Sequence, residues 1–155
     1  AAGGPIAAAR SVKLFFDTSV LVASVVSEHP HHARALPVIR SALSSRNEGC
    51  IAAHALAETY AVLTTLPVSP RIAPEAAQKL VAENLVGRFE VVALSAREYE
   101  RLIGSLPERG AIGGSVSAGI PLEWGSKAAG DRIHSFNAAA SRRLPTRWAD
   151  RIAAP

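Results

Sequence analysis

The sequence predicts a single α/β domain in which helices flank a small parallel sheet. Along its 155 residues, short apolar runs alternate with longer segments of helical periodicity. Strands that are separated by helices are joined by crossovers, and crossovers make neighbouring strands parallel. The composition, 48% hydrophobic and 19% charged, is that of a globular domain and excludes a disordered chain.

Four short apolar runs are expected to form the sheet. The first, Val12–Phe16, contains only Lys13 as a polar residue, as expected for a strand that is covered on both faces. The other predicted strands are Gly49–Ala52, Phe89–Leu94 and Arg132–Phe136. Since ligands bind beyond the carboxyl ends of parallel strands, polar residues at these ends are candidates for a site.

Five helices are predicted between the strands. Their ranges are Thr18–Val26, Pro30–Ser44, Ala53–Thr65, Pro74–Val86 and Ser95–Leu106. Leu56, Tyr60 and Leu63 mark the expected apolar face of the third helix. Ser95 and Glu98 match a capping box, which begins the fifth.

The chain is expected to have one domain, residues 12–150, after a flexible lead-in, residues 1–11. It has a single cysteine, so no intramolecular disulfide is possible, and a cytoplasmic location is the simplest interpretation. No apolar run approaches the roughly 20 residues that span a bilayer, so no membrane association is expected.

The net charge is +4, and only three of the 17 basic residues are lysine. Guanidinium groups bind phosphates bidentately, which favours a polyanionic partner such as RNA. The alternative is that both arginine and alanine are abundant because the coding sequence is rich in G and C. Charge alone favours this alternative.

Two carboxylates are candidates for chemistry. Asp17 directly follows the first buried strand, where a parallel sheet places its site, although Asp17, Thr18 and Ser19 are also typical helix caps. Glu58 is a charge among apolar neighbours of the third helix, so it either lies in a cleft or belongs to a solvated stripe. The sequence leaves both pairs of alternatives open.

The remaining candidates have simpler interpretations. His54 shares a helix face with Glu58 and is interpreted as a residue near the helix start that the backbone satisfies. His29, His31 and His32 are interpreted as solvated surface, and Cys50 as a small buried hydrophobe.

Three strings, FFDTSVLVA at 15–23, HALAETYAVLT at 54–64 and AAGDRIHSFN at 128–137, together resemble the PIN domain of VapC toxins. The resemblance covers about residues 12–144. It implies a three-layer sandwich and an endoribonuclease dependent on Mg²⁺ or Mn²⁺. Asp17 and Glu58 then fall on metal ligands, and Asn137 on a catalytic position after the last strand.

The third acidic motif of the family is degenerate here. Where VapC toxins usually have Tyr-Asp-Ala-Leu after a double glycine, this chain has Ser117-Ala118-Gly119-Ile120, so Ala118 replaces an acidic ligand. Glu123 lies five positions later, about 140° around a helix, so it is not expected to substitute.

The resemblance also implies partners. It predicts an RNA substrate, a VapB-like antitoxin that inhibits the toxin, and a homodimer. The arginines that are candidates for contact with RNA or antitoxin are Arg97, Arg101, Arg132, Arg142, Arg143 and Arg147. The alternative function is a catalytically inactive PIN-fold protein that binds RNA or the antitoxin, and Ala118 favours it.

Overall fold

The computed structural model describes residues 11–44, 46–112, 116, 123–125, 127–138 and 149–155. These form a sheet of five strands in the order β3-β2-β1-β4-β5, in which every neighbouring pair is parallel. The strands are β1 (Val12–Phe16), β2 (Asn47–Ala52), β3 (Glu90–Val92), β4 (Arg132–His134) and β5 (Ile152–Ala153). Because β1 is central, its carboxyl end lies between those of β2 and β4.

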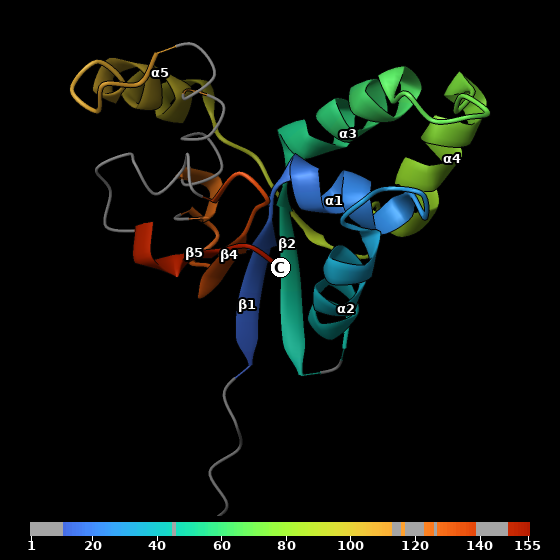
Figure 1. Cartoon of the computed structure of the whole chain (residues 1–155). Coiled ribbons are helices and arrows are strands. Elements are labelled where there is room, and N and C mark those ends of the chain that lie inside the picture. The colour runs from blue at the N-terminus through green and yellow to red at the C-terminus, as the bar shows by residue number, and fades with distance from the viewer. Residues whose placement is uncertain (1–10, 45, 113–115, 117–122, 126, 139–148) are drawn as a thin grey trace, which may run out of the picture.

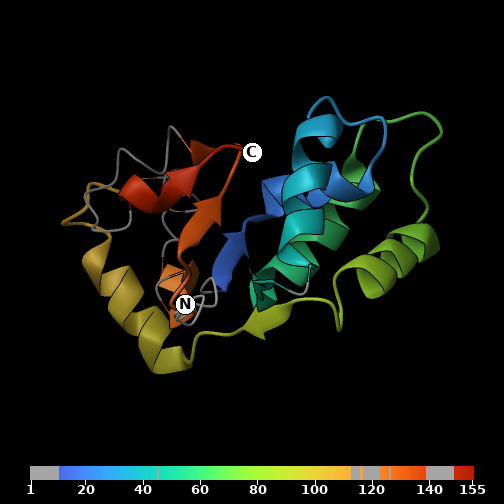
Figure 2. The same ribbon diagram turned by 90° about the horizontal axis from the view of Figure 1, so that it is seen from below.

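Helices lie on both sides of the sheet. The first four helices gather on one side of the central strands and the fifth lies on the other, as Figure 1 and the view from below in Figure 2 show. They are α1 (Thr18–Val25), α2 (His32–Ala42), α3 (Ala53–Thr65), α4 (Pro74–Asn84) and α5 (Ala96–Ser105); a short 3₁₀ helix, η1 (Ala149–Arg151), precedes β5. The α/β class and the three layers predicted from the sequence are confirmed.

The core explains why β1 is an uninterrupted apolar run. Leu14, Phe15 and Phe16 are all buried, although successive side chains of a strand point to opposite faces, so both faces of β1 are covered. A smaller cluster of Val22, Val26, Leu63 and Ala77 joins α1, α3 and α4. This cluster packs the second half of α1 against the last turns of α3, and so fixes the relative position of the two helices.

The predicted elements are confirmed: β1 and α3 have the predicted ends, and the ends of the others are shifted. The capping box is present: Ser95 accepts from the Glu98 N–H, and Glu98 accepts from the Ser95 N–H at 2.7 Å. Helix α2 is shorter than predicted at both ends and contains Pro37. Strand β5 was not predicted because two residues are too few to show a periodic pattern.

One predicted core residue was wrong. Tyr60 is 38% exposed, and α3 instead buries Ala55, Thr59 and Leu63. Both α1 and α4 contact α3, and the buried stripe keeps the predicted Leu63 but is displaced by one position in the two turns before it. In the part of the chain that the structure describes, no helix is long and apolar enough to span a membrane.

Candidate active site

Asp17 lies at the carboxyl end of β1 and caps α1. Its Oδ1 accepts a hydrogen bond from the Val20 N–H at 3.3 Å and another from the Ser19 hydroxyl, while its own N–H donates to the His134 carbonyl at 3.2 Å. The capping role is thus present, and it does not exclude a chemical role. Because backbone and side chain are both held, the carboxylate has a fixed position at the end of the sheet.

Asp17 is only 9% exposed as a residue. Burial raises its pKa, and hydrogen bonds from Ser135, Ser19 and Val20 oppose this shift. Among the described residues, no lysine or arginine forms an ion pair with it. A buried carboxylate in these surroundings favours the approach of a cation.

Glu58 reaches the same region from α3. The Thr18 hydroxyl donates to Glu58 Oε2 at 2.5 Å, which links the first turn of α1 to α3. Glu58 is exposed, so it is not the buried charge that its apolar neighbours suggested. It nevertheless lines a pocket. The two alternatives left open by the sequence, a place in a cleft and a place on the solvated side of the helix, therefore both apply in part.

The third part of the site follows β4. The Phe136 N–H donates to the Ser19 hydroxyl at 3.0 Å, and the Asn137 N–H donates to the Ser135 hydroxyl at 2.9 Å. Because β1 and β4 are neighbouring parallel strands, the segments after them meet at one edge of the sheet. Ser19 is hydrogen-bonded to both segments and fixes one against the other.

These residues surround a pocket of about 580 Å³, which we call the carboxyl-edge pocket. Its lining includes Thr18, Ser19, His31, Glu58, Phe136 and Asn137. Glu58 and Asn137 therefore lie on one pocket, and Asp17 lies directly beside its Thr18 and Ser19 wall. Within the described residues, no group of three or more His, Cys, Asp or Glu side chains is placed to hold a metal ion.

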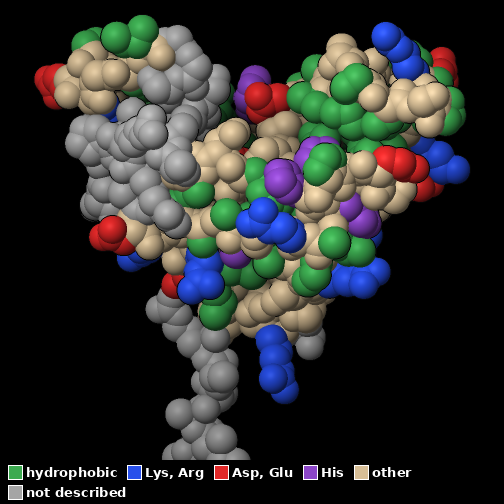
Figure 3. Space-filling view, in the orientation of Figure 1, with side chains coloured by type: hydrophobic (Ala, Val, Ile, Leu, Met, Phe, Trp, Pro, Cys, Tyr) green, Lys and Arg blue, Asp and Glu red, His purple; other side chains and the backbone are tan. Residues whose placement is uncertain are grey.

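The structure also shows a wall of the pocket that the sequence interpretation missed. His29, His31 and His32 are partly buried rather than solvated, and the first two line the carboxyl-edge pocket. Histidine side chains gather near the middle of the face shown in Figure 3. The only sequence signal was their clustering around Pro30, which does not reveal that this loop faces the segment after β4.

The altered third motif is described only in part. Ala118 and Ser117 lie outside the described residues, so the position of the missing acidic ligand stays a prediction. Glu123 is described, and it pairs with Arg109 at 2.8 Å instead of lining the carboxyl-edge pocket. This agrees with the expectation that Glu123 does not replace a carboxylate at position 118.

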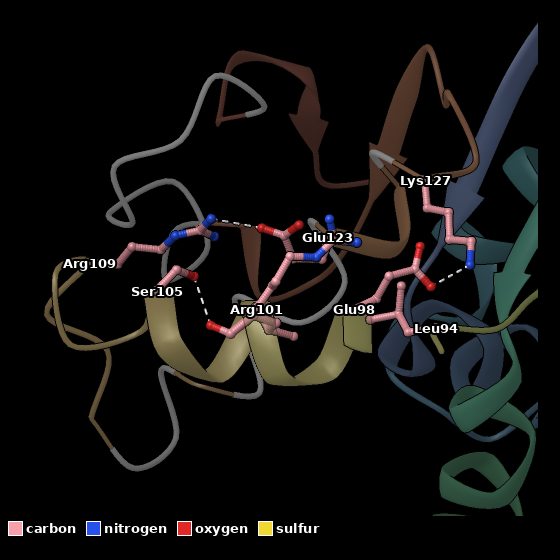
Figure 4. A pocket seen from close by; sticks show the side chains of 8 residues that line it. Leu94, Glu98, Arg101, Ser105, Arg109, Glu123 and Lys127 are labelled. Carbon is pink, nitrogen blue, oxygen red and sulfur yellow. Dashed lines mark hydrogen bonds and ion pairs between the residues drawn. The ribbon is translucent and has the colours of Figure 1, made fainter. Parts of the chain in front are cut away.

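Glu123 lines a second pocket, of about 380 Å³, beside α5. We call it the α5 pocket; it is also lined by Leu94, Glu98, Arg101, Arg109 and Lys127 (Figure 4). Lys127 donates to Glu98 at 2.6 Å and to the Ala93 carbonyl at 2.7 Å. The Lys127 hydrogen bond, with those of Ser95, lowers the pKa of Glu98 to about 2.

His54 and Cys50 do not belong to either pocket. The exposed His54 ring stacks on Trp124 with centroids 6.2 Å apart. Cys50 is fully buried, and burial raises the pKa of its thiol to about 12, so it is an inert core residue as predicted.

Comparison with known proteins gives a consistent assignment. Residues 14–117 match the PIN domain family. The chain is 36% identical over 118 residues to the ribonuclease VapC40 of Mycobacterium tuberculosis, a match that covers 76% of this chain and 81% of that relative. The sequence match thus includes most of both proteins.

Two solved structures share the fold. VapC20 of Mycobacterium tuberculosis, a toxin that cleaves the sarcin-ricin loop, superposes with a TM-score of 0.65 at 20% identity, over 83% of this chain and 92% of that chain. VapBC2 of Rickettsia felis, bound to a promoter DNA fragment, gives a TM-score of 0.54 at 17% identity, over 86% of this chain and 94% of that chain. The family match and the identity to VapC40 show that this chain belongs to the PIN-domain family and, within it, to the VapC-type toxins.

Proposed function

We propose that this chain is a VapC-type endoribonuclease that hydrolyses RNA phosphodiester bonds with the help of Mg²⁺ or Mn²⁺. The observation that carries the proposal is the carboxyl-edge pocket. A buried carboxylate beside its wall, Asp17, and a second carboxylate on it, Glu58, are held by hydroxyl and backbone N–H groups and not by basic side chains. The identity to the ribonuclease VapC40 supports the same activity.

The donor atoms of this pocket suit a hard divalent cation. Carboxylate, carboxamide and hydroxyl oxygens are the ligands that Mg²⁺ and Mn²⁺ prefer, and Mg²⁺ often uses only one or two carboxylates and keeps several waters. Asp17 and Glu58 would hold the ion, with Asn137 at the same pocket. A bound ion would lower the pKa of a coordinated water, so no side-chain nucleophile is needed.

The chain's own residues would orient the site. The Ser19 hydroxyl donates to Asp17 and accepts from the Phe136 N–H, so it fixes the carboxylate relative to the segment that carries Asn137. The Thr18 hydroxyl donates to Glu58 and so ties this carboxylate to the first turn of α1. Such outer contacts keep ligands in place before the ion arrives, which typically improves metal affinity 10- to 100-fold.

The alternative function is a catalytically inactive PIN-fold protein that binds RNA or an antitoxin. The observation that favours it is Ala118, which removes an acidic ligand of the family's pattern. With two carboxylates, the site would bind its ion more weakly than a complete one. If the chain is a ribonuclease, we therefore expect RNA cleavage that is weaker than that of a complete site but still requires the metal.

The partners belong to the same proposal. A VapB-like antitoxin would inhibit the toxin, a homodimer would be the active assembly, and the cytoplasm would be the compartment; the similarity to VapBC2 supports the antitoxin. Arg97, Arg101 and Arg132 remain candidates for RNA or antitoxin contact, whereas Arg142, Arg143 and Arg147 lie outside the described residues.

Cleavage of a structured RNA tests the proposal directly. The protein is assayed with Mg²⁺, with Mn²⁺ and with EDTA, and Mn²⁺ binding is measured by calorimetry. We expect cleavage with either metal and none with EDTA. Metal-independent cleavage would contradict the metal assignment, and RNA binding without any cleavage would favour the inactive binding protein.

Restoring the missing acid gives a second test. Ala118→Asp is expected to increase Mn²⁺ affinity and cleavage by about tenfold, because a further carboxylate ligand fixes the ion. Ala118→Asn is the matched control, since it has nearly the same size without the charge. A folded Ala118→Asp variant that is no more active than the parent would show that position 118 does not face the ion.

A further inference from the structure

One wall of the carboxyl-edge pocket is built from flat rings. The His31 imidazole stacks on the Phe136 ring, with centroids 4.5 Å apart and planes 21° from parallel. The His29 ring lies 5.6 Å from the His31 ring at 50°. All three residues line the same pocket as Glu58 and Asn137, and we call them the ring wall.

The backbone around the ring wall is fixed by hydrogen bonds. The His31 N–H donates to His29 Nδ1 at 3.1 Å, and the His29 N–H donates to the Val26 carbonyl at 3.0 Å. His32 Nδ1 lies 2.8 Å from the Ala23 carbonyl, so the loop is tied to α1 on both sides of Pro30. The wall therefore exists before any ligand binds.

Phe136 is held from the other side of the site. Its N–H donates to the Ser19 hydroxyl at 3.0 Å, and the Arg34 guanidinium lies over its ring at 5.4 Å from the centroid. Ser19 also donates to Asp17, so a single hydroxyl connects the ring wall to the buried carboxylate. The wall has a fixed distance from the oxygen donors that would surround the metal ion.

The histidines are not arranged as metal ligands. His29 Nδ1 is already occupied by the His31 N–H, and the described residues contain no group of three or more ligating side chains. His29 Nδ1 accepts from the His31 N–H, so this bond needs the neutral ring, and burial, with the nearby His31 and His32, lowers the pKa of His29 in the same direction. A neutral, partly buried ring next to a stacked pair is suited to contact with another flat group.

We infer that the ring wall binds an unpaired base of the RNA by stacking, next to the phosphate that is cleaved. This inference rests on the proposed function and adds the part of the substrate that the pocket recognises. Proteins recognise single-stranded RNA by stacking splayed bases on Phe, Tyr, Trp or His, and the contact tolerates any base because every base has a flat face. A pocket of about 580 Å³ has the volume typical of small-molecule sites.

The arrangement favours an RNA base over a peptide side chain. The rings lie on the pocket that also contains Glu58 and Asn137, so a ligand on the wall reaches the proposed reaction centre. In a nucleotide, one sugar joins a flat base to a phosphate. The base would lie on the ring wall while the phosphate lies near Glu58 and Asn137.

The test scans an RNA hairpin in which each loop nucleotide in turn is made abasic. Affinity is measured with Ca²⁺ in place of Mg²⁺, so that cleavage is not required. We expect one abasic position to weaken binding to the wild-type protein by roughly tenfold, the usual effect of one stacked base. In His31→Ala and Phe136→Leu, the same abasic position should cause little further loss.

Two control variants separate stacking from structural damage. His31→Phe keeps a ring and should retain wild-type affinity. His54→Ala removes a histidine that also stacks on an aromatic ring but lies outside the pocket, so it should bind RNA as the wild-type protein does. The salt dependence of binding should be unchanged in His31→Ala, because stacking releases no counterions from phosphate. Circular dichroism and thermal melting establish that each variant is folded.

The outcomes distinguish the inference from the proposed function. If the loss of RNA affinity caused by the abasic site and the loss caused by His31→Ala are fully additive, the two changes are independent. The wall then does not contact the base, and the inference is overturned even where cleavage is normal. If the wild-type protein never cleaves but the losses fail to add, the base contact stands and the ribonuclease proposal fails. If both wall variants bind RNA normally but lose an antitoxin peptide, the wall recognises protein and the inference is again overturned.

Discussion

The carboxyl-edge pocket and the α5 pocket contain similar charged residues in opposite electrostatic situations. In the α5 pocket, Lys127 lies 2.6 Å from Glu98, and Arg109 lies 2.8 Å from Glu123. At the carboxyl-edge pocket, the Ser19 hydroxyl and the Val20 N–H hold the adjoining Asp17, and the Thr18 hydroxyl holds Glu58. No basic side chain among the described residues pairs with either carboxylate. Both acids of the α5 pocket are thus paired with basic side chains of the same pocket, whereas the carboxylates at the carboxyl-edge pocket have no such counter-charge among the described residues.

This difference separates a structural cluster from a candidate reaction centre. An acidic group that already has a cation at hydrogen-bond distance gains little from a metal ion, whereas a buried carboxylate whose hydrogen-bond donors are all uncharged gains much. Residue type and pocket size would not distinguish the two regions. The two regions differ in the group that is hydrogen-bonded to each carboxylate. Substitutions at the four carboxylates, Asp17, Glu58, Glu98 and Glu123, test this difference.

The largest difference should be in catalysis, between Glu58→Gln and Glu123→Gln. We expect Glu58→Gln to reduce Mn²⁺-dependent cleavage at least about 100-fold, because loss of a ligand should exceed the 10- to 100-fold effect of losing an outer partner. Glu123→Gln removes a carboxylate from the other pocket and should leave the rate within about twofold, since its charge only neutralises Arg109. Initial rates at saturating Mn²⁺ measure both.

Equal effects of these two substitutions would contradict the comparison. If Glu123→Gln slows cleavage as much as Glu58→Gln while melting normally, the α5 pocket takes part in catalysis. If neither has an effect, the carboxyl-edge pocket is not the reaction centre.

Local sequence patterns pick out the two candidate carboxylates, whose roles stay a prediction, but they do not reveal the surroundings of either. Asp17 follows a strand and Glu58 lies within one helix, so local patterns place both. The ring wall depends on contact between the loop at His29–His31 and Phe136, which are about a hundred residues apart, and no local pattern encodes that contact. For the same reason the pairing of Glu123 with Arg109 could not be predicted.

The fold was predictable where hydrophobic patterning is strong. The run Val12–Phe16 and the helix Ala53–Thr65 were predicted with their observed ends, since burial on both faces and long periodicity give clear signals. The short strand Ile152–Ala153 exists only because β4 offers it an edge. Tyr60 was misplaced because the packing of two helices, not the sequence of one, selects the buried face.

The second prediction concerns stability at Asp17. Its folded pKa is raised by burial, so its carboxyl group favours folding at a pH below its unfolded pKa of about 3.9 and disfavours folding as pH rises through the folded pKa. Asp17→Asn keeps a capping oxygen for the Val20 N–H and removes the buried charge. We expect it to raise the free energy of unfolding at pH 7 by roughly 1–3 kcal/mol, and to have a smaller effect at pH 3.5.

Urea denaturation at both pH values, with and without Mn²⁺, measures this effect. Mn²⁺ should stabilise the wild-type protein and should not stabilise Asp17→Asn, because binding to the folded state alone raises stability. The exposed Asp150→Asn is the control. A loss of stability at pH 7 in Asp17→Asn would show that its hydrogen bonds outweigh the desolvation of its charge.

The third prediction uses the opposite pKa shift in the α5 pocket. Lys127, together with Ser95, lowers the pKa of Glu98 to about 2. This carboxylate therefore contributes stability that is present above its unfolded pKa and is lost as pH falls toward 2. We expect Glu98→Gln, which can still form the capping box, to lose less stability than the wild-type protein between about pH 4.5 and pH 2. Acid unfolding of the wild-type protein and of Glu98→Gln is followed by circular dichroism. Two unfolding curves that superimpose would contradict this prediction.

The smallest expected effect is the coupling between Arg109 and Glu123. The two side chains are 24% and 33% exposed, so water screens the pair, and partly exposed ion pairs contribute about 0.2–1 kcal/mol. A double-mutant cycle of Arg109→Gln, Glu123→Gln and the double variant isolates this coupling from the other contacts of each residue. Urea denaturation at low and high salt should show a coupling that decreases as salt increases.

This cycle is also the most sensitive test of whether the α5 pocket is merely neutralised. A structural pair predicts that all three variants cleave RNA at the parental rate and differ only slightly in stability. If the coupling instead exceeds about 2 kcal/mol, or appears in the cleavage rate, the pair does more than screened charges of this exposure can do. The α5 pocket would then have to transmit the position of Glu123 to the carboxyl-edge pocket, and the two regions would form one functional unit.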